Sequence, residues 1–156
     1  MTEPTIYLCD DDEGVRSSIA FLLRQHDLLV KTYASGPELL AEVDTWPTPR
    51  RGIFVLDVRM EPLSGLQVHD ALISRALDRR MPVLFLSGHG DIPMAVGAMA
   101  KGAFSFAEKP YADGALVELM RRALDLEARW HGHVARHDAL VQLFGSLSRQ
   151  QVRLMP

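Results

Sequence analysis

Reactive-looking polar side chains stand where the short apolar stretches of this sequence end. They are Asp10 and Asp11 after the first stretch, Asp57 after the third, Ser87 after the fourth and Lys109 after the fifth. Crowded carboxylates need a cation to offset their mutual repulsion, and hard oxygen ligands of this kind suit Mg²⁺. A metal ion, an ammonium and a hydroxyl can together hold the three oxygens of a phosphoryl group.

One of these carboxylates could act as a nucleophile and carry the phosphoryl group as an acyl phosphate. Asp57 is the best candidate because it is single and lies at the centre of the set. Each residue alone also has a plain structural interpretation: an acidic pair after a strand often caps a helix. Ser87 could simply form a turn, and Lys109 before a proline could simply lie in a loop. The specificity comes from their occurring together, in order, at the ends of successive strands.

The elements that must position these residues are read from the hydrophobic pattern. Five short apolar runs are predicted to be strands, at residues 6–9, 28–33, 53–56, 82–86 and 103–107. Amphipathic stretches with helical spacing separate them. Strands that are apolar throughout are buried on both faces, and strands joined by helices pair in parallel. The pattern therefore predicts an α/β sandwich of three layers whose functional groups converge at the carboxyl edge of the sheet.

Local signals refine this pattern. Ser35 is expected to cap the second helix, and the third helix is expected from about Leu66 to Leu77. Asp91 is expected to cap a fourth helix that ends at Ala100. The last helix is expected to start near Asp113 and to extend beyond what one sheet needs to cover.

Composition excludes several classes of protein. The 156 residues are 47% hydrophobic and 24% charged, with a formal net charge of −3 and one cysteine. An internal disulfide is therefore excluded, and no apolar run reaches the roughly 18 residues that span a membrane. The amino-terminus is too short and too acidic for a signal peptide, so a cytoplasmic protein is expected. Acidic side chains outnumber basic ones in residues 1–120, whereas basic side chains outnumber acidic ones in residues 121–156.

Four stretches resemble the receiver domain of two-component response regulators. They are LCDDDEGVR (8–16), FVLDVRMEPLSG (54–65), LSGHGDIPMAV (86–96) and AFSFAEKPY (103–111). The resemblance covers about residues 5–125, and the stretch SGHGDIPMAVGAMAKGA (87–103) is similar to FixJ-type regulators. The fold it implies is a flavodoxin-like, doubly wound, five-stranded parallel sheet, (βα)5, with an extended C-terminal helix.

The resemblance also implies a role for each metal-site residue, with Mg²⁺ as the cofactor. Asp57 matches the phosphoacceptor, and it is also expected to contact the metal. Asp10 and Asp11 match the acidic pair, with Asp11 as the direct ligand and Asp10 acting through water. Arg59 would bind the metal through its backbone carbonyl. Glu61 stands where the family usually has proline, so the shape of the loop near the metal is an open question.

Three further residues match the family's switch. Ser87 corresponds to the switch hydroxyl, and Lys109 corresponds to the lysine that contacts the phosphoryl group. Phe106 corresponds to the aromatic residue that turns inward when the hydroxyl moves. The peptide bond between Lys109 and Pro110 is expected to be cis.

The basic end of the chain is interpreted as a connection to an output domain. Residues 1–125 are assigned to the receiver, residues 126–146 to a helical linker and residues 147–156 to the start of a truncated helix-turn-helix domain. A capping box from Ser148 to Gln151 supports a new helix there. The alternative is a frayed terminal helix with no DNA role.

Together these features predict a phosphorylation-driven switch rather than a classical enzyme. The expected partners are a sensor histidine kinase and a second copy of the chain, which would bind through the face of the fourth helix formed by Met94, Val96, Met99 and Lys101. DNA would be bound only through an output domain missing from this chain, and no membrane contact is expected.

Three alternatives remain open. A haloacid-dehalogenase-like phosphatase would need a second carboxylate two residues after Asp57, where Arg59 stands. A flavodoxin-like cofactor binder would need a phosphate loop where the acidic residues 10–13 lie. A stand-alone receiver would act through protein contacts without DNA.

Overall fold

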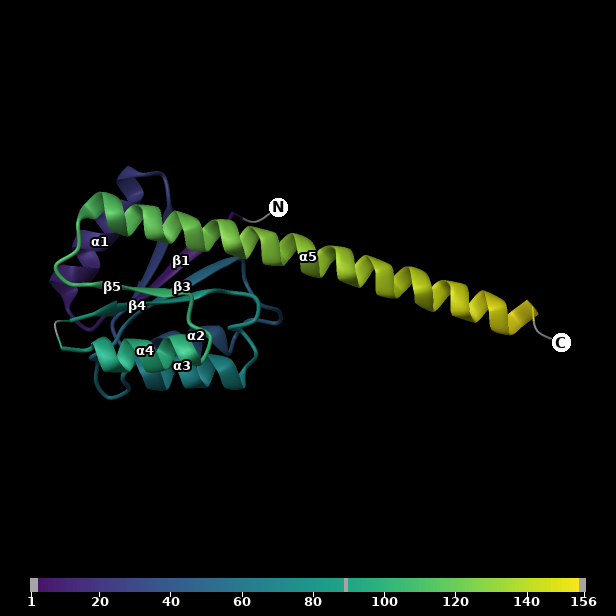
Figure 1. Ribbon diagram of the computed structural model, residues 1–156, viewed down its shortest axis with the longest axis horizontal. Helices are drawn as coiled ribbons and strands as arrows, with labels where there is room; N and C mark the ends of the chain where they lie inside the picture. The colour runs from purple at the N-terminus through teal and green to yellow at the C-terminus, as the bar shows by residue number, and fades with distance from the viewer. Residues whose placement is uncertain (1–2, 89, 155–156) are drawn as a thin grey trace.

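The computed structural model describes the backbone of residues 3–88 and 90–154, with side chains up to residue 133. Strands and helices alternate along the whole chain (Figure 1). The strands are β1 (Thr5–Cys9), β2 (Leu29–Tyr33), β3 (Gly52–Asp57), β4 (Val83–Ser87) and β5 (Ser105–Glu108). The helices are α1 (Glu13–Gln25), α2 (Gly36–Val43), α3 (Gly65–Ser74), α4 (Ile92–Ala100) and α5 (Asp113–Leu154). The predicted α/β class is confirmed.

All five strands pair in parallel, in the order β2-β1-β3-β4-β5. The central strands β3 and β4 are buried at every residue, as their continuous apolar runs predict. The strand order reverses between β1 and β3, which is where open α/β sheets form their binding crevice. This is the flavodoxin-like arrangement expected from the sequence.

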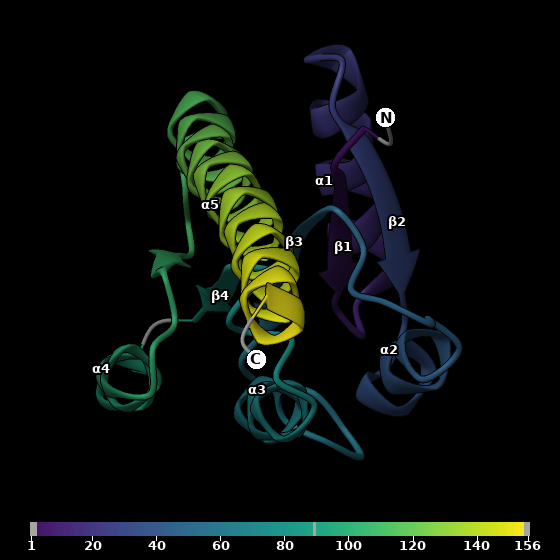
Figure 2. The same ribbon diagram turned by 90° about the vertical axis from the view of Figure 1, so that its right-hand side faces the viewer.

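The helices cover the two faces of the sheet (Figure 2). Helices α2, α3 and α4 pack on one face over a core that contains Phe54, Leu56 and Phe85. Helices α1 and α5 pack on the other face over a core that contains Ile53 and Val55. Alternate residues of the same strands therefore enter opposite cores, because successive side chains of a strand point to opposite faces.

Helix α2 begins with the cap that its sequence predicts, and α3 begins with a cap that was not predicted. The Ser35 side chain accepts a hydrogen bond from the Glu38 backbone at the start of α2. Ser64 and Gln67 form a reciprocal capping box at the start of α3. Each cap satisfies backbone donors that the first turn of a helix leaves unpaired.

Two boundaries and one cap differ from the prediction. Helix α3 ends at Ser74 rather than near Leu77, because Ala76 adopts φ 56° and the Leu77 amide returns to the Leu72 carbonyl. Strand β5 begins at Ser105 rather than at residue 103, since that is where its pairing with β4 starts. Asp91 precedes α4 as expected, but its side chain makes no capping hydrogen bond.

Helix α5 runs from Asp113 to Leu154 without a break and extends past the sheet (Figure 1). The helix start predicted at Ser148 is therefore wrong, since that residue lies inside α5. The glycines at 132 and 145 are also helical, because one glycine costs a helix only about 1 kcal/mol. Among residues 3–88 and 90–154, no helix is long and apolar enough to cross a membrane.

A buried ion pair fastens α5 to the sheet. The Glu127 carboxylate, 1% exposed, accepts hydrogen bonds from the Arg51 guanidinium at 2.8 and 2.9 Å and from the Gly52 backbone at 2.9 Å. These contacts join α5 at Glu127 to the start of β3 at Gly52. They lie at the amino edge of the sheet, opposite the residues singled out for chemistry.

Candidate functional site

The strand ends place the predicted site residues at one edge of the sheet. Asp57 is the last residue of β3 and Ser87 the last residue of β4. Asp10 directly follows β1, and Lys109 directly follows β5. Because parallel strands end at the same edge, residues up to 99 positions apart are brought together.

Three carboxylates form the centre of this site. Ligand oxygens of Asp10, Asp11 and Asp57 all lie within 4.8 Å of one another. Asp10 is fully buried, Asp57 is 6% exposed and Asp11 is exposed. The Asp10 Oδ1 atom accepts a hydrogen bond from the Asp12 backbone at 2.9 Å, whereas its buried Oδ2 has no hydrogen-bond partner among the described residues. A buried carboxylate oxygen without a hydrogen bond, beside two more carboxylates, fits a divalent cation.

Burial and charge repulsion raise the pKa values of Asp10 and Asp57. Burial, followed by the charge of Asp10, raises the pKa of Asp57 to about 6, and the charge of Lys109 opposes this rise. Burial also raises the pKa of Asp10, against a backbone hydrogen bond and the charge of Lys109. Both shifts show that the ionised carboxylates lack sufficient positive charge from the protein itself.

Lys109 supplies the one ammonium that the described structure brings to this cluster. Its Nζ lies 3.5 Å from Asp57 Oδ1 and 3.9 Å from Asp10 Oδ2. Ser87 is fully buried, and its Oγ has no hydrogen-bond partner among the described residues. The bond between Lys109 and Pro110 is cis, as the resemblance implies, and that between Glu61 and Pro62 is also cis.

The predicted switch and loop residues lie around this centre. Phe106 is half-buried in β5 and packs against the core beneath α3 and α4. The side chain of Arg59 forms an ion pair with Asp91 at 2.6 Å. Glu61 lines a cavity of about 500 Å³ that also contains Asp11, so the departure from the family pattern faces the metal side of the site.

Sequence reasoning missed the roles of two residues. Asp91 was expected to cap α4, but its 1% exposed side chain instead binds Arg59 and the Gly88 backbone. Gly65 passes so close to the Asp57 carbonyl that a Cβ atom there would collide with it. The glycine of the turn after β3 was a signal for such a close approach, whereas no local pattern predicted the bond between Arg59 and Asp91.

The comparison with known families decides against two of the three alternatives. The response regulator receiver domain matches residues 6–121, which include every residue of the carboxylate cluster. The chain belongs to the response regulator receiver family. It is therefore a receiver domain rather than a classical enzyme such as a phosphatase, and rather than a cofactor binder of the flavodoxin kind.

Relatives of this receiver are known as sequences and as structures. It is 42% identical to the C4-dicarboxylate transport transcriptional regulatory protein DctR of Rhodobacter capsulatus, over 86% of this chain and 66% of that protein. It is 39% identical to the transcriptional regulatory protein FixJ of Rhizobium meliloti strain 1021, over 79% of this chain and 58% of that protein. The chain thus spans about two thirds or less of the length of these relatives.

Solved structures agree with the fold. The FixJ-N crystal structure has a TM-score of 0.72 and 37% identity, and the match covers 80% of this chain and 96% of that chain. The low-resolution structure of response regulator StyR has a TM-score of 0.83 and 31% identity, and the match covers 99% of this chain and 79% of that chain. The predicted resemblance to FixJ-type regulators is confirmed.

Proposed function

We propose that Asp57 of this receiver takes a phosphoryl group from a histidine kinase in a step that requires Mg²⁺. The observation that carries the proposal is the cluster of three carboxylates within 4.8 Å, with the Lys109 ammonium 3.5 Å from Asp57. When bound, the metal supplies positive charge that offsets the carboxylates and the phosphoryl oxygens. Asp10 and Asp11 hold it, together with Asp57 and the backbone carbonyl of Arg59.

The transfer is a displacement at phosphorus. An oxygen of the Asp57 carboxylate attacks the phosphorus atom of a phosphohistidine, the bond from phosphorus to the imidazole nitrogen breaks, and the electron pair leaves on that nitrogen. Lys109 holds a phosphoryl oxygen as a point charge, and Ser87 donates its hydroxyl hydrogen to another. Hydrolysis of the acyl phosphate by water is the slow return step.

The phosphorylated state differs from the resting state at the switch residues. The Ser87 hydroxyl is buried and has no hydrogen-bond partner among the described residues, so a phosphoryl oxygen would offer it a hydrogen bond. Movement of Ser87 toward that oxygen leaves space beneath β5, into which Phe106 turns. The phosphoryl group therefore favours one of two arrangements of β4, β5 and α4.

The surface that responds is the exposed face of α4. Met94, Val96 and Met99 are 44%, 58% and 39% exposed there, and Ile92 at the start of the helix is 39% exposed. Four large apolar side chains exposed on one short helix are typical of a surface that becomes buried on association. We propose that two phosphorylated receivers dimerise through this face, with Lys101 at its end.

The signal passes to a DNA-binding output. Several relatives carry names that describe transcriptional regulation, and they are longer than this chain. We assign residues 1–125 to the receiver, 126–146 to a linker and 147–156 to the beginning of an output domain. The cytoplasm is the compartment proposed for this system, because the kinase and the DNA must both reach the protein.

Phosphorylation with a small donor tests the proposal. The chain is incubated with phosphoramidate and Mg²⁺, and intact mass is measured. A gain of one phosphoryl group is expected for the parent chain, and none for Asp57→Asn or after chelation of the metal. Equal labelling of Asp57→Asn would show that another residue accepts the group. The dimer face is tested by sedimentation of the labelled chain. The parent is expected to sediment as a dimer, and the variant Val96→Asp as a monomer.

A further inference from the structure

An ion pair between Arg59 and Asp91 joins the loop after β3 to the loop after β4. Arg59 lies two residues after Asp57, and Asp91 lies four residues after Ser87, directly before α4. The Arg59 Nε atom donates a hydrogen bond to Asp91 Oδ1 at 2.6 Å. The pair therefore connects the segment next to the proposed phosphoacceptor with the segment next to the proposed switch hydroxyl.

The Asp91 carboxylate is buried, and its second oxygen also has a partner. Asp91 is 1% exposed, and its Oδ2 atom accepts a hydrogen bond from the Gly88 backbone at 2.9 Å. The Gly88 carbonyl accepts a hydrogen bond from the Asp91 backbone at 3.1 Å. Since Gly88 directly follows Ser87, Asp91 holds the backbone that carries the switch hydroxyl. The carboxylate depends on these partners, because an unpaired buried charge is strongly unfavourable.

The loop after β3 is the anchored side of this connection. The Val58 amide donates a hydrogen bond to the Leu86 carbonyl at 3.0 Å, and the Gly65 amide donates one to the Val58 carbonyl at 3.0 Å. Arg59 therefore follows an anchored backbone, whereas Asp91 precedes α4, a helix that is proposed to move. A movement of Asp91 by about 1 Å away from Arg59 would lengthen their contact beyond the range of a hydrogen bond.

We propose that Asp91 is a positioning residue, whose pair with Arg59 holds Ser87 in the resting arrangement and so opposes phosphorylation. This inference rests on the proposed function, because it assigns a restraint to the switch proposed for Ser87. The receiver reaches the switched arrangement only where the contacts of the phosphoryl group outweigh the loss of this pair. Breaking the pair therefore favours the switched arrangement before any phosphoryl group is added.

The exposure of the two partners sets the size of the effect. A hydrogen bond between charged groups contributes more when both groups are buried than when both are in water. The Asp91 side chain is buried, but the Arg59 side chain is 70% exposed, so solvent screens part of the attraction. Loss of the pair is therefore expected to raise the equilibrium constant for the switched arrangement about tenfold.

Binding of beryllofluoride to the full chain tests this inference. Beryllofluoride is an analogue of the phosphoryl group that binds reversibly to a carboxylate, so its apparent affinity follows the fraction of switched chains. Asp91→Asn keeps an oxygen for the Gly88 amide and removes the charge that binds Arg59. With Mg²⁺ present, Asp91→Asn is expected to bind beryllofluoride about tenfold more tightly than the parent. Equal or weaker binding by Asp91→Asn would overturn the proposal.

NMR of the metal-free chain gives a readout that a merely structural role would not move. The amide signals of β5, with Phe106 among them, are recorded for the parent, for Asp91→Asn and for the parent with beryllofluoride and Mg²⁺. Without metal or beryllofluoride, the signals of Asp91→Asn are expected to shift toward those of the bound parent. Failure of the parent to bind beryllofluoride would overturn the proposed function and this inference together. Normal binding by the parent, with no such shift in Asp91→Asn, would overturn this inference alone.

A double-mutant cycle separates the ion pair from other effects of Arg59. Arg59→Met removes the guanidinium, so the pair is already broken in that background. Adding Asp91→Asn to Arg59→Met is therefore expected to give no gain in beryllofluoride affinity, whereas adding it to Arg59→Lys, which keeps the charge, should give a partial gain. A gain of about tenfold in the Arg59→Met background would overturn the proposal.

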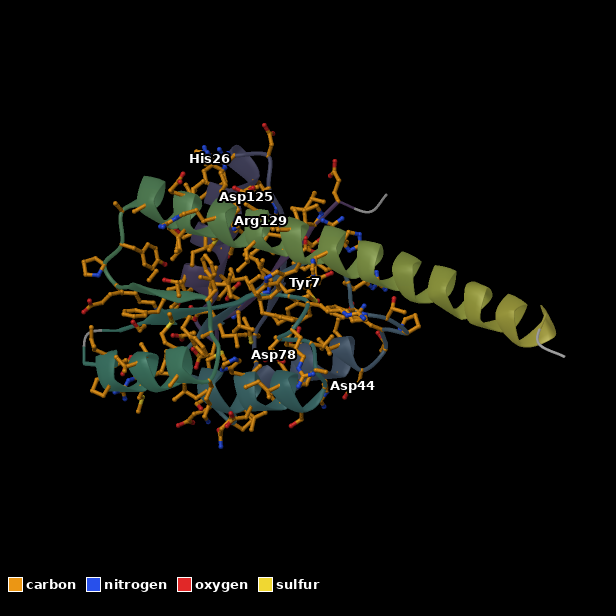
Figure 3. The ribbon with its side chains drawn as sticks, turned by 45° about the vertical axis from the view of Figure 1, so that its right-hand side comes forward. Tyr7, His26, Asp44, Asp78, Asp125 and Arg129 are labelled. Atoms are coloured by element: carbon orange, nitrogen blue, oxygen red, sulfur yellow. The ribbon has the colours of Figure 1, made fainter. Side chains whose placement is uncertain are left out.

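The ion pair between Arg75 and Asp44 offers a matched control. Its Nε–Oδ1 distance is 2.7 Å, close to that of the pair between Arg59 and Asp91. Asp44 directly follows α2 and lies on the side toward which α5 extends past the sheet (Figure 3), at the edge opposite the phosphorylation site. Asp44→Asn is therefore expected to keep the beryllofluoride affinity within about twofold of the parent. A gain equal to that of Asp91→Asn would overturn the proposal, because the effect would not depend on the loop after β4.

Discussion

Replacing Asp57 with asparagine is expected to stabilise the metal-free receiver while abolishing its function. The Asp57 carboxylate is 6% exposed and lies beside Asp10, and burial with this repulsion raises its pKa from 3.8 to about 6. A shift of about 2 units corresponds to about 3 kcal/mol of destabilisation when the group is ionised, since each unit is worth about 1.4 kcal/mol. The substituted amide still loses hydration, so a gain of about 1–2 kcal/mol is expected.

The sign of the pH dependence follows from the direction of the shift. The folded receiver holds the Asp57 proton more tightly than the unfolded chain, so ionisation destabilises the fold at every pH above about 6. As the pH falls from about 6 to about 4 the penalty disappears, and the difference between parent and Asp57→Asn should shrink toward zero. Millimolar Mg²⁺ should stabilise the parent more than the variant.

Urea denaturation measures each of these differences. Free energies of unfolding are extrapolated for both chains at about pH 7.5 and about pH 4.5, with and without Mg²⁺. Asp125→Asn, an exposed carboxylate on α5, is the control and should change stability by less than about 0.5 kcal/mol. If Asp57→Asn is less stable than the parent in chelator at about pH 7.5, the electrostatic reasoning is refuted.

Further predictions concern residues that stabilise the fold or lie close to the site. Glu127→Ala leaves Arg51 and the Gly52 amide without their partner and should cost about 3–5 kcal/mol in urea denaturation, whereas Glu118→Ala on the exposed side of α5 should cost little. Gly65→Ala forces a Cβ onto the Asp57 carbonyl, so it should lower both the melting temperature and the rate of phosphoramidate labelling. Gly97→Ala meets no atom and should instead stabilise the chain by about 0.5–1 kcal/mol; a loss of stability would show that α4 needs this glycine.

The elements around the site were predictable because their signals are local. The runs at 6–9 and 53–56 are apolar on both faces, which identifies buried parallel strands without knowledge of their neighbours. Once the order of the strands is known, Asp10 and Asp57 must meet. The caps at Ser35 and Ser64 are likewise set by residues within three positions of each helix start.

What the sequence could not predict depends on contacts between distant residues. Glu127 lies in a helix whose charged side chains up to residue 133 are mostly exposed, and only the fold brings it to Arg51, 76 positions away. The position of Asp91 before α4 predicts a helix cap. Its bond to Arg59, 32 positions away, is visible only in the folded structure. The extent of α5 was also missed, since the glycines and the capping box near its end resemble a break in local sequence.

The most direct test of the account is to identify the residue that carries the phosphoryl group. The chain is labelled with phosphoramidate and Mg²⁺, the acyl phosphate is reduced with borohydride, and peptides are mapped by mass spectrometry. Reduction converts a phosphorylated aspartate into homoserine, and the account predicts this conversion at Asp57 alone. Conversion at Asp10 or Asp11 with Asp57 unchanged would contradict it.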